Sequence, residues 1–139
     1  IIMDVGHGAG SFKFDVAKSA FEHGFFPDTI STDLYTMNVN GPVYDLPTTM
    51  SKMLNLGMPI EDIICSTSSI PAKVIGRPEL GSLSPGSTAD VSIFELEEDN
   101  FEFTDSHGDT RLWPFRLTCQ MTLLGGDIIF NKNTVDNML

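Results

Sequence analysis

The chain has 139 residues, 41% apolar and 19% charged, which is the size and composition of a folded domain rather than a disordered segment. Its formal charge of -11, from 8 basic and 19 acidic residues, argues against a nucleic-acid partner, because phosphate binding needs clustered basic side chains. The same charge argues against docking on anionic membranes, and no apolar run reaches the ~18 residues of a membrane span.

The pattern of the first eighty residues predicts a strand, a helix and a second strand. We expect strands over 1–5 and 29–32, with a glycine-rich turn at 6–10 and a helix capped by Ser11 that runs to about His23. A connecting helix implies parallel strands. Parallel strands are covered on both faces, so two of them predict the end of a larger barrel or sheet.

Helices are expected to fill residues 46–76. Asp45 has the place of an N-cap and Pro47 that of a first-turn proline, while Gly57, Pro59 and Pro71 mark helix ends and starts. The hydroxyls of 48–51 either cap this helix or face a ligand, and we favour capping, with Lys52 in solvent. The side chains expected to be buried here are Met50, Met53, Met58, Ile60, Ile63, Ile64 and Cys65.

Beyond residue 80 the pattern changes to strands and turns, and the charge becomes more acidic. We expect a small antiparallel β domain, a sandwich, over 81–139, following the barrel part over 1–80. A Gly125–Gly126 pair has the composition of a two-residue hairpin turn, and the acidic stretch 95–109 is expected to face solvent. The expected strands are 91–96, 101–103, 116–124 and 127–130.

Two polar side chains, His7 and Asp33, directly follow the expected parallel strands. The carboxyl ends of such strands carry active sites in α/β proteins, and an aspartate there can ligate a metal or act as a general base. From the residues alone, a turn or capping role for Asp33 and a surface position for His7 stay open. The other histidines, His23 and His107, are expected in solvent.

Four segments resemble the amidohydrolase superfamily, in its deacetylase and dihydroorotase-like branch of metal-dependent hydrolases. They are DVGHGAGSF at 4–12, ISTDL at 30–34, NGPVYDLPTTMSK at 40–52 and LGSLSPGSTADV at 80–91. The resemblance extends to about residue 130. It implies a (β/α)8 TIM-like barrel with an appended β-sandwich, in which the strands before His7 and Asp33 are the seventh and eighth.

The resemblance also implies a site and a reaction. Asp33 would ligate a divalent metal, zinc in one or two copies, and act as general base toward a metal-activated hydroxide that attacks an amide or ester carbonyl. His7 would contact the substrate or stabilise the transition state, and Gly8, Gly41 and Pro42 would line the substrate site. The eighth-strand motif of the branch often continues to a histidine where this chain has Tyr35.

The chain begins inside a strand-like run without an initiator Met, and we expect a C-terminal fragment. The family's His-x-His pair, lysine and two further histidines would then lie before Ile1, so the fragment alone is expected to be inactive. Two alternatives stay open: a non-catalytic half-barrel that pairs with a partner or with itself, and a small ligand-binding module around His7. Two cysteines without metal or disulfide spacing favour the cytoplasm.

Overall fold

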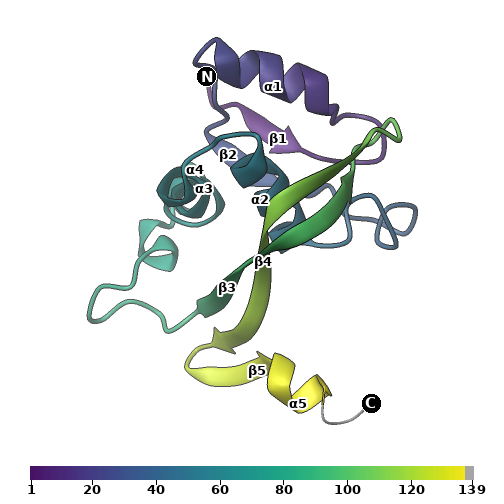
Figure 1. The fold of residues 1–139 in the computed structure, drawn as a ribbon. Coiled ribbons are helices and arrows are strands. Elements are labelled where there is room, and N and C mark those ends of the chain that lie inside the picture. Colours follow the sequence, from purple (N-terminus) through teal and green to yellow (C-terminus); the bar gives the residue numbers. More distant parts are fainter. Residues whose placement is uncertain (137–139) are drawn as a thin grey trace.

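A parallel strand pair lies at the N-terminal end of the fold, as the sequence predicts. The computed structural model describes residues 1–136 and contains β1 (Asp4–Gly6), α1 (Phe14–Glu22) and β2 (Thr29–Ser31). Val5 pairs with Ile30 in parallel register. The strand pair lies between α1 on one side and the helices of residues 46–74 on the other (Figure 1).

The predicted cap of α1 is wrong. The helix begins at Phe14, too far along the chain for Ser11 to cap it, and Lys13 at the N-cap position makes no side-chain bond to it. The N–H of Phe14 instead donates to Oδ2 of Asp105 at 3.0 Å. A residue distant in sequence therefore replaces the local cap.

Three helices and a 3₁₀ turn follow, namely α2 (Leu46–Asn55), α3 (Ile60–Thr67), α4 (Ser69–Val74) and η1 (Pro78–Gly81). The Asp45 cap is confirmed, because its Oδ1 accepts the N–H of Thr48 at 2.7 Å. Gly57 follows α2 with φ of 106°, a conformation that favours glycine. Pro71 lies within the first turn of α4 rather than at its start.

The C-terminal part forms an antiparallel sheet in the order β3 (Val91–Thr104), β4 (Thr110–Leu124) and β5 (Asp127–Asn131), followed by α5 (Lys132–Asp136). The two strands predicted at 91–96 and 101–103 are one strand, because a register shift between Glu98 and Phe101 absorbs Asp99 and Asn100. The hairpin turn at Gly125–Gly126 is confirmed, and both glycines have positive φ. The described residues form one three-stranded sheet here.

β4 begins six residues before the predicted strand, despite the proline at position 114. Pro114 lies between Trp113 and Phe115, whose partners Phe101 and Glu98 flank the register shift. A proline is tolerated there because the ladder is already interrupted. The strand is therefore longer than its local composition indicates.

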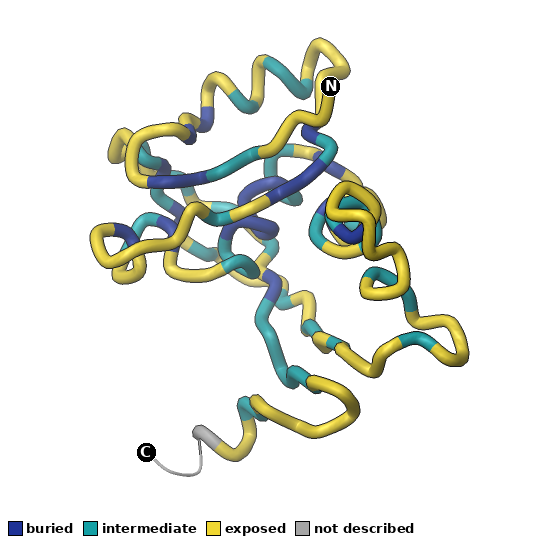
Figure 2. The backbone as a smooth tube through the Cα atoms, turned by 180° about the vertical axis from the view of Figure 1, so that it is seen from behind, coloured by how far each residue is buried: buried dark blue, intermediate teal, exposed yellow. Residues whose placement is uncertain are grey.

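One core joins the two parts of the chain. Figure 2 shows buried residues gathered where the β1–β2 pair and α2 approach the β3–β4 hairpin, whereas the C-terminal end is largely exposed. The core includes residues on both sides of position 80. The division into two domains near that position stays a prediction. The core consists of Phe12, Phe14, Ile30, Met50, Met53, Met58, Ile63, Phe103 and Leu117.

Two burial predictions on α3 are wrong. Ile63 is fully buried, but Ile64 is 40% exposed and Cys65 is exposed. Each residue of a helix is rotated by ~100° from the one before, so the two positions after Ile63 face away from the core. No helix within residues 1–136 has the length and hydropathy of a transmembrane span.

Two side chains of α2 form hydrogen bonds with the part of the β4 edge that β5 does not cover. The Asn55 amide donates to the carbonyl of Phe115 at 2.6 Å and accepts its N–H at 3.2 Å. The Ser51 hydroxyl accepts the N–H of Leu117 at 2.9 Å. These bonds satisfy backbone groups of β4 that would otherwise form an open edge.

Candidate functional site

His7 and Asp33 lie at the carboxyl end of the parallel pair, as predicted. His7 directly follows β1, and Asp33 is the second residue after β2. The loops are joined by a hydrogen bond from the N–H of Gly8 to the carbonyl of Thr32, at 3.1 Å. The structure therefore brings the two candidates to one edge of the sheet.

Gly8 allows the first loop to approach the Asp33 carboxylate. Its φ is 55°, and a Cβ placed on it would lie 2.8 Å from Oδ2 of Asp33. Asp33 itself has φ of 49°. This left-handed conformation is uncommon for a residue with a side chain and is more frequent for Asp and Asn than for most others. Gly8 adopts its positive φ readily because it has no Cβ, whereas Asp33 is held in a conformation that is uncommon for a residue with a side chain.

The Asp33 side chain is exposed, and its carboxylate accepts no hydrogen bond from residues 1–136. Its backbone carbonyl accepts from the Asn38 amide at 2.9 Å, and the Asn38 oxygen in turn accepts the N–H of Tyr35 at 2.8 Å. Asn38 is fully buried. The loop after β2 is therefore organised from its backbone, which leaves both carboxylate oxygens of Asp33 available to a ligand.

The imidazole of His7 is fully buried, and both ring nitrogens are bonded within the protein. Nδ1 lies 2.9 Å from the carbonyl oxygen of Gly8, and Nε2 lies 2.7 Å from Nζ of Lys52. Burial, followed by the charge of Lys52, lowers the pKa of His7 to about 4. The ring is therefore neutral near pH 7. Its predicted contact with substrate or transition state stays a prediction.

Lys52 is buried within the fold, so the prediction that it lies in solvent is wrong. Its Nζ lies 2.7 Å from the carbonyl of Pro42 and 2.8 Å from that of Thr104, in addition to the His7 contact. Burial lowers the pKa of Lys52 to about 8, while the charges of Asp105 and Asp45 act in the opposite direction. The side chain therefore remains mainly an ammonium at pH 7.

The turn between β3 and β4 contacts the His7 loop. The Ser106 hydroxyl lies 3.1 Å from the carbonyl oxygens of His7 and of Gly8. Its backbone N–H donates to the carbonyl of Phe12 at 3.0 Å. Next to it, the buried Asp105 accepts three backbone N–H bonds, which lower the pKa of its carboxyl group although burial opposes ionisation. The sheet therefore supports the loop that follows β1.

The other predicted substrate residues lie in the loop before α2. The carbonyl of Pro42 is bonded to Lys52, and the N–H of Gly41 donates to the carbonyl of Asn38 at 3.1 Å. Through Asn38, this loop is connected to the backbone of Asp33. Tyr35 is exposed beside it. The structure links these residues to the site, and their contact with substrate stays a prediction.

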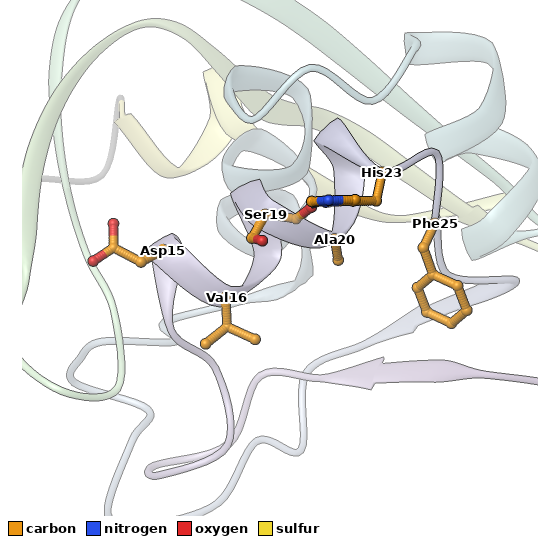
Figure 3. A pocket seen from close by; sticks show the side chains of 6 residues that line it. All are labelled: Asp15, Val16, Ser19, Ala20, His23 and Phe25. Carbon is orange, nitrogen blue, oxygen red and sulfur yellow. The ribbon is translucent and has the colours of Figure 1, made fainter.

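A surface hollow lies elsewhere, on the outer face of α1. Six side chains line it, as Figure 3 shows: Asp15, Val16, Ser19, Ala20, His23 and Phe25. None of them belongs to the candidate site. A second hollow, between the loop before α2 and the β3–β4 hairpin, has Lys52 in its wall. His23 and His107 are exposed, as predicted.

Sequence reasoning missed Lys52, Asp105 and Ser106. For Lys52 a signal exists, because it lies between Met50 and Met53, which are expected to be buried; residues 49–53 of α2 are in fact all buried. A lysine at such a position needs buried acceptors. Asp105 and Ser106 have no comparable signal, since they resemble ordinary turn residues.

Comparison with known proteins identifies the family. Residues 13–129 match the model of the Amidohydrolase family. The chain is 48% identical over 109 residues to a deacetylase of Brucella anthropi, covering 78% of this chain and 27% of that protein. Solved structures of an adenine deaminase and a dihydroorotase superpose with TM-scores of 0.90 and 0.87, each at 39% identity. Each alignment covers 94% of this chain, and 36% and 35% of those chains.

The chain thus spans about a quarter to a third of the length of these proteins. On the extent of the family match and the identity to the solved structures, it belongs to the amidohydrolase family.

Proposed function

We propose that the intact protein carrying this chain is a metal-dependent amidohydrolase that cleaves amide C–N or ester bonds of a small molecule. In this proposal β1 and β2 are the seventh and eighth strands of a (β/α)8 barrel, and the β3–β5 sheet belongs to an appended β-sandwich. The observation that carries the proposal is Asp33, an exposed carboxylate at the carboxyl end of β2 in a member of this family.

The similar proteins support the reaction class. They are described as a deacetylase, an adenine deaminase and a dihydroorotase. All three descriptions denote cleavage at a carbon bonded to nitrogen or oxygen. Because the chain covers about a third of those structures or less, the substrate itself is not assigned.

The donor chemistry of Asp33 fits one ligand of a divalent metal such as zinc, because its carboxylate oxygens are not used within the described chain. Residues 1–136 contain no group of three or more His, Cys, Asp or Glu side chains that could hold an ion. We therefore propose that further ligands come from the parts of the intact protein outside this chain. When bound, such an ion lowers the pKa of water and polarises the scissile carbonyl.

The chain's own residues would act around Asp33. Its free carboxylate oxygens would hold the ion and take a proton from the attacking water. Gly8 presents only backbone beside Oδ2 of Asp33, so a substrate group has room to approach. Gly41 and Pro42 would contribute substrate contacts from the neighbouring loop. A cytoplasmic location, favoured by the cysteine content, is part of the same proposal.

The test is hydrolysis by the intact protein and its Asp33→Asn variant on a panel of N-acetylated amino acids, acetyl esters and cyclic amides. We expect the variant to lose ~100-fold or more in kcat, as expected for loss of a general base, and to bind less metal. Asp62→Asn, at an exposed position on α3, is the control and should leave both unchanged. Full activity in Asp33→Asn would contradict the proposal.

Exposed apolar residues near β1 favour a further contact surface. Ile1, Ile2 and Leu34 are all largely exposed around the strand pair. In the proposed enzyme, other barrel segments cover them. In the alternative, a non-catalytic half-barrel, a partner chain or a second copy does so. Hydrolysis and metal binding by the intact protein distinguish these, because only the proposed enzyme requires both.

A further inference from the structure

The ammonium group of Lys52 has one acceptor for each of its three protons. These are Nε2 of His7 at 2.7 Å and the carbonyls of Pro42 at 2.7 Å and Thr104 at 2.8 Å. An ammonium has three donors and no acceptor, so this set satisfies it completely. Because the lysine is fully buried, the arrangement leaves no proton for solvent.

This arrangement determines the tautomer of His7. Nε2 faces a group that only donates, so it must carry the lone pair. Nδ1 lies 2.9 Å from the carbonyl of Gly8, which only accepts, and 3.4 Å from the Ser106 hydroxyl, which can donate or accept, so the shorter contact favours the proton on Nδ1. The Lys52 contact requires this neutral tautomer, and the Gly8 contact favours it. A low pKa of the ring agrees with this state, because a second ring proton would face the ammonium.

The His7 ring in turn holds Gly8. The carbonyl of Gly8 accepts from His7 Nδ1, and its N–H donates to Thr32 at 3.1 Å, next to Asp33 in the chain. Gly8 is the residue whose Cα lies against the Asp33 carboxylate, since a Cβ there would be 2.8 Å from Oδ2. The position of Gly8 therefore limits where that carboxylate can lie.

We propose that Lys52 is a positioning residue that fixes His7 as the Nδ1–H tautomer, so that the ring holds Gly8 beside Asp33. The part that concerns catalysis rests on the proposed function, whereas the tautomer does not. The competing interpretation is that Lys52 only ties α2 to the Pro42 and Thr104 carbonyls. That interpretation predicts a loss of stability with no change at the imidazole.

The test is long-range ¹H–¹⁵N NMR of the intact protein with ¹⁵N-labelled histidine, with His7→Gln used for assignment. We expect the Nδ1–H tautomer in the wild type. Lys52→Met keeps the length of the side chain and removes the donor that excludes the other tautomer, so the Nε2–H form, with Nδ1 accepting from the Ser106 hydroxyl, should become populated. Lys73→Met, at an exposed lysine on α4, is the matched control and should leave the His7 signals unchanged.

An Nε2–H tautomer in the wild type overturns the proposal, and this holds even if Lys52→Met fails to fold. An unchanged tautomer in folded Lys52→Met overturns it as well. In the active enzyme, Lys52→Met should lower kcat by ~10- to 100-fold, the range for residues that orient a site through another group, with a smaller change in KM. A tautomer shift together with full activity of Asp33→Asn supports the positioning of His7 and contradicts the proposed function instead.

Discussion

Oδ2 of Asp105, at the end of β3, accepts the backbone N–H of Phe14, the first residue of α1, across 91 positions of sequence. Oδ1 of the same carboxylate accepts the N–H groups of His107 and Asp109 at 2.8 and 3.0 Å. One buried side chain therefore caps a helix and closes a hairpin. It also holds the turn that contacts the His7 loop.

Asp105→Ala should lower the free energy of unfolding by about 2–4 kcal/mol, because one buried and two partly buried backbone N–H groups lose a charged acceptor. Asp105→Asn keeps one acceptor oxygen and should lose less. Urea denaturation of the intact protein measures both. Asp99→Ala, at an exposed position of β3, is the control, and an equal loss in this variant would contradict the capping role of Asp105.

Acid should destabilise the protein through His7. Its pKa is lowered from 6.5 to about 4 by burial and by Lys52. Between these values the unfolded chain binds a proton at His7 and the folded chain does not, so stability falls as pH drops from 6.5 toward 4. The full shift corresponds to a loss on the order of 3 kcal/mol.

Urea denaturation at about pH 7 and about pH 4.5 tests this linkage. His7→Gln removes the titrating group, so its stability should fall less between the two conditions than that of the wild type. His107→Gln removes an exposed histidine and should behave like the wild type. An equally steep loss in His7→Gln would show that other groups carry the acid sensitivity.

Gly8→Ala should displace the Asp33 carboxylate, because the new methyl group would lie 2.8 Å from Oδ2. In the proposed enzyme this lowers kcat by ~10-fold or more, as expected for a shift of a catalytic group. Gly24→Ala is a matched control, with φ of 75° and no atom within 4 Å of its Cβ. Both variants should lose about 1 kcal/mol of stability from positive φ, and only Gly8→Ala should lose activity.

Asn55→Ala should weaken the docking of α2 on β4. The amide bonds both backbone groups of Phe115, and its loss leaves them without protein partners at the strand edge. We expect a loss of about 1–3 kcal/mol in the free energy of unfolding. Asn100→Ala, an exposed asparagine on β3, should cost much less in the same urea titration. Similar losses in the two variants would show that the contact of Asn55 with the strand edge does not explain the loss of stability.

Elements with local signals could be predicted from the residues alone. The N-cap at Asp45, the glycine after α2 and the Gly125–Gly126 turn depend on residues within a few positions of each other. Their backbone preferences act before any tertiary contact forms. The strand–helix–strand order similarly places His7 and Asp33 at one edge, because parallel strands end on the same side.

The surroundings of His7 and Asp33, in contrast, depend on contacts between segments that are distant in the sequence. The acceptors of Lys52 lie 10, 45 and 52 positions away, and the cap of α1 lies 91 positions away. Periodicity predicts which face of a helix is buried, but it does not show which polar groups will meet there. Lys52 was therefore expected in solvent and Cys65 in the core, because packing between distant segments decides burial where the local pattern permits either outcome.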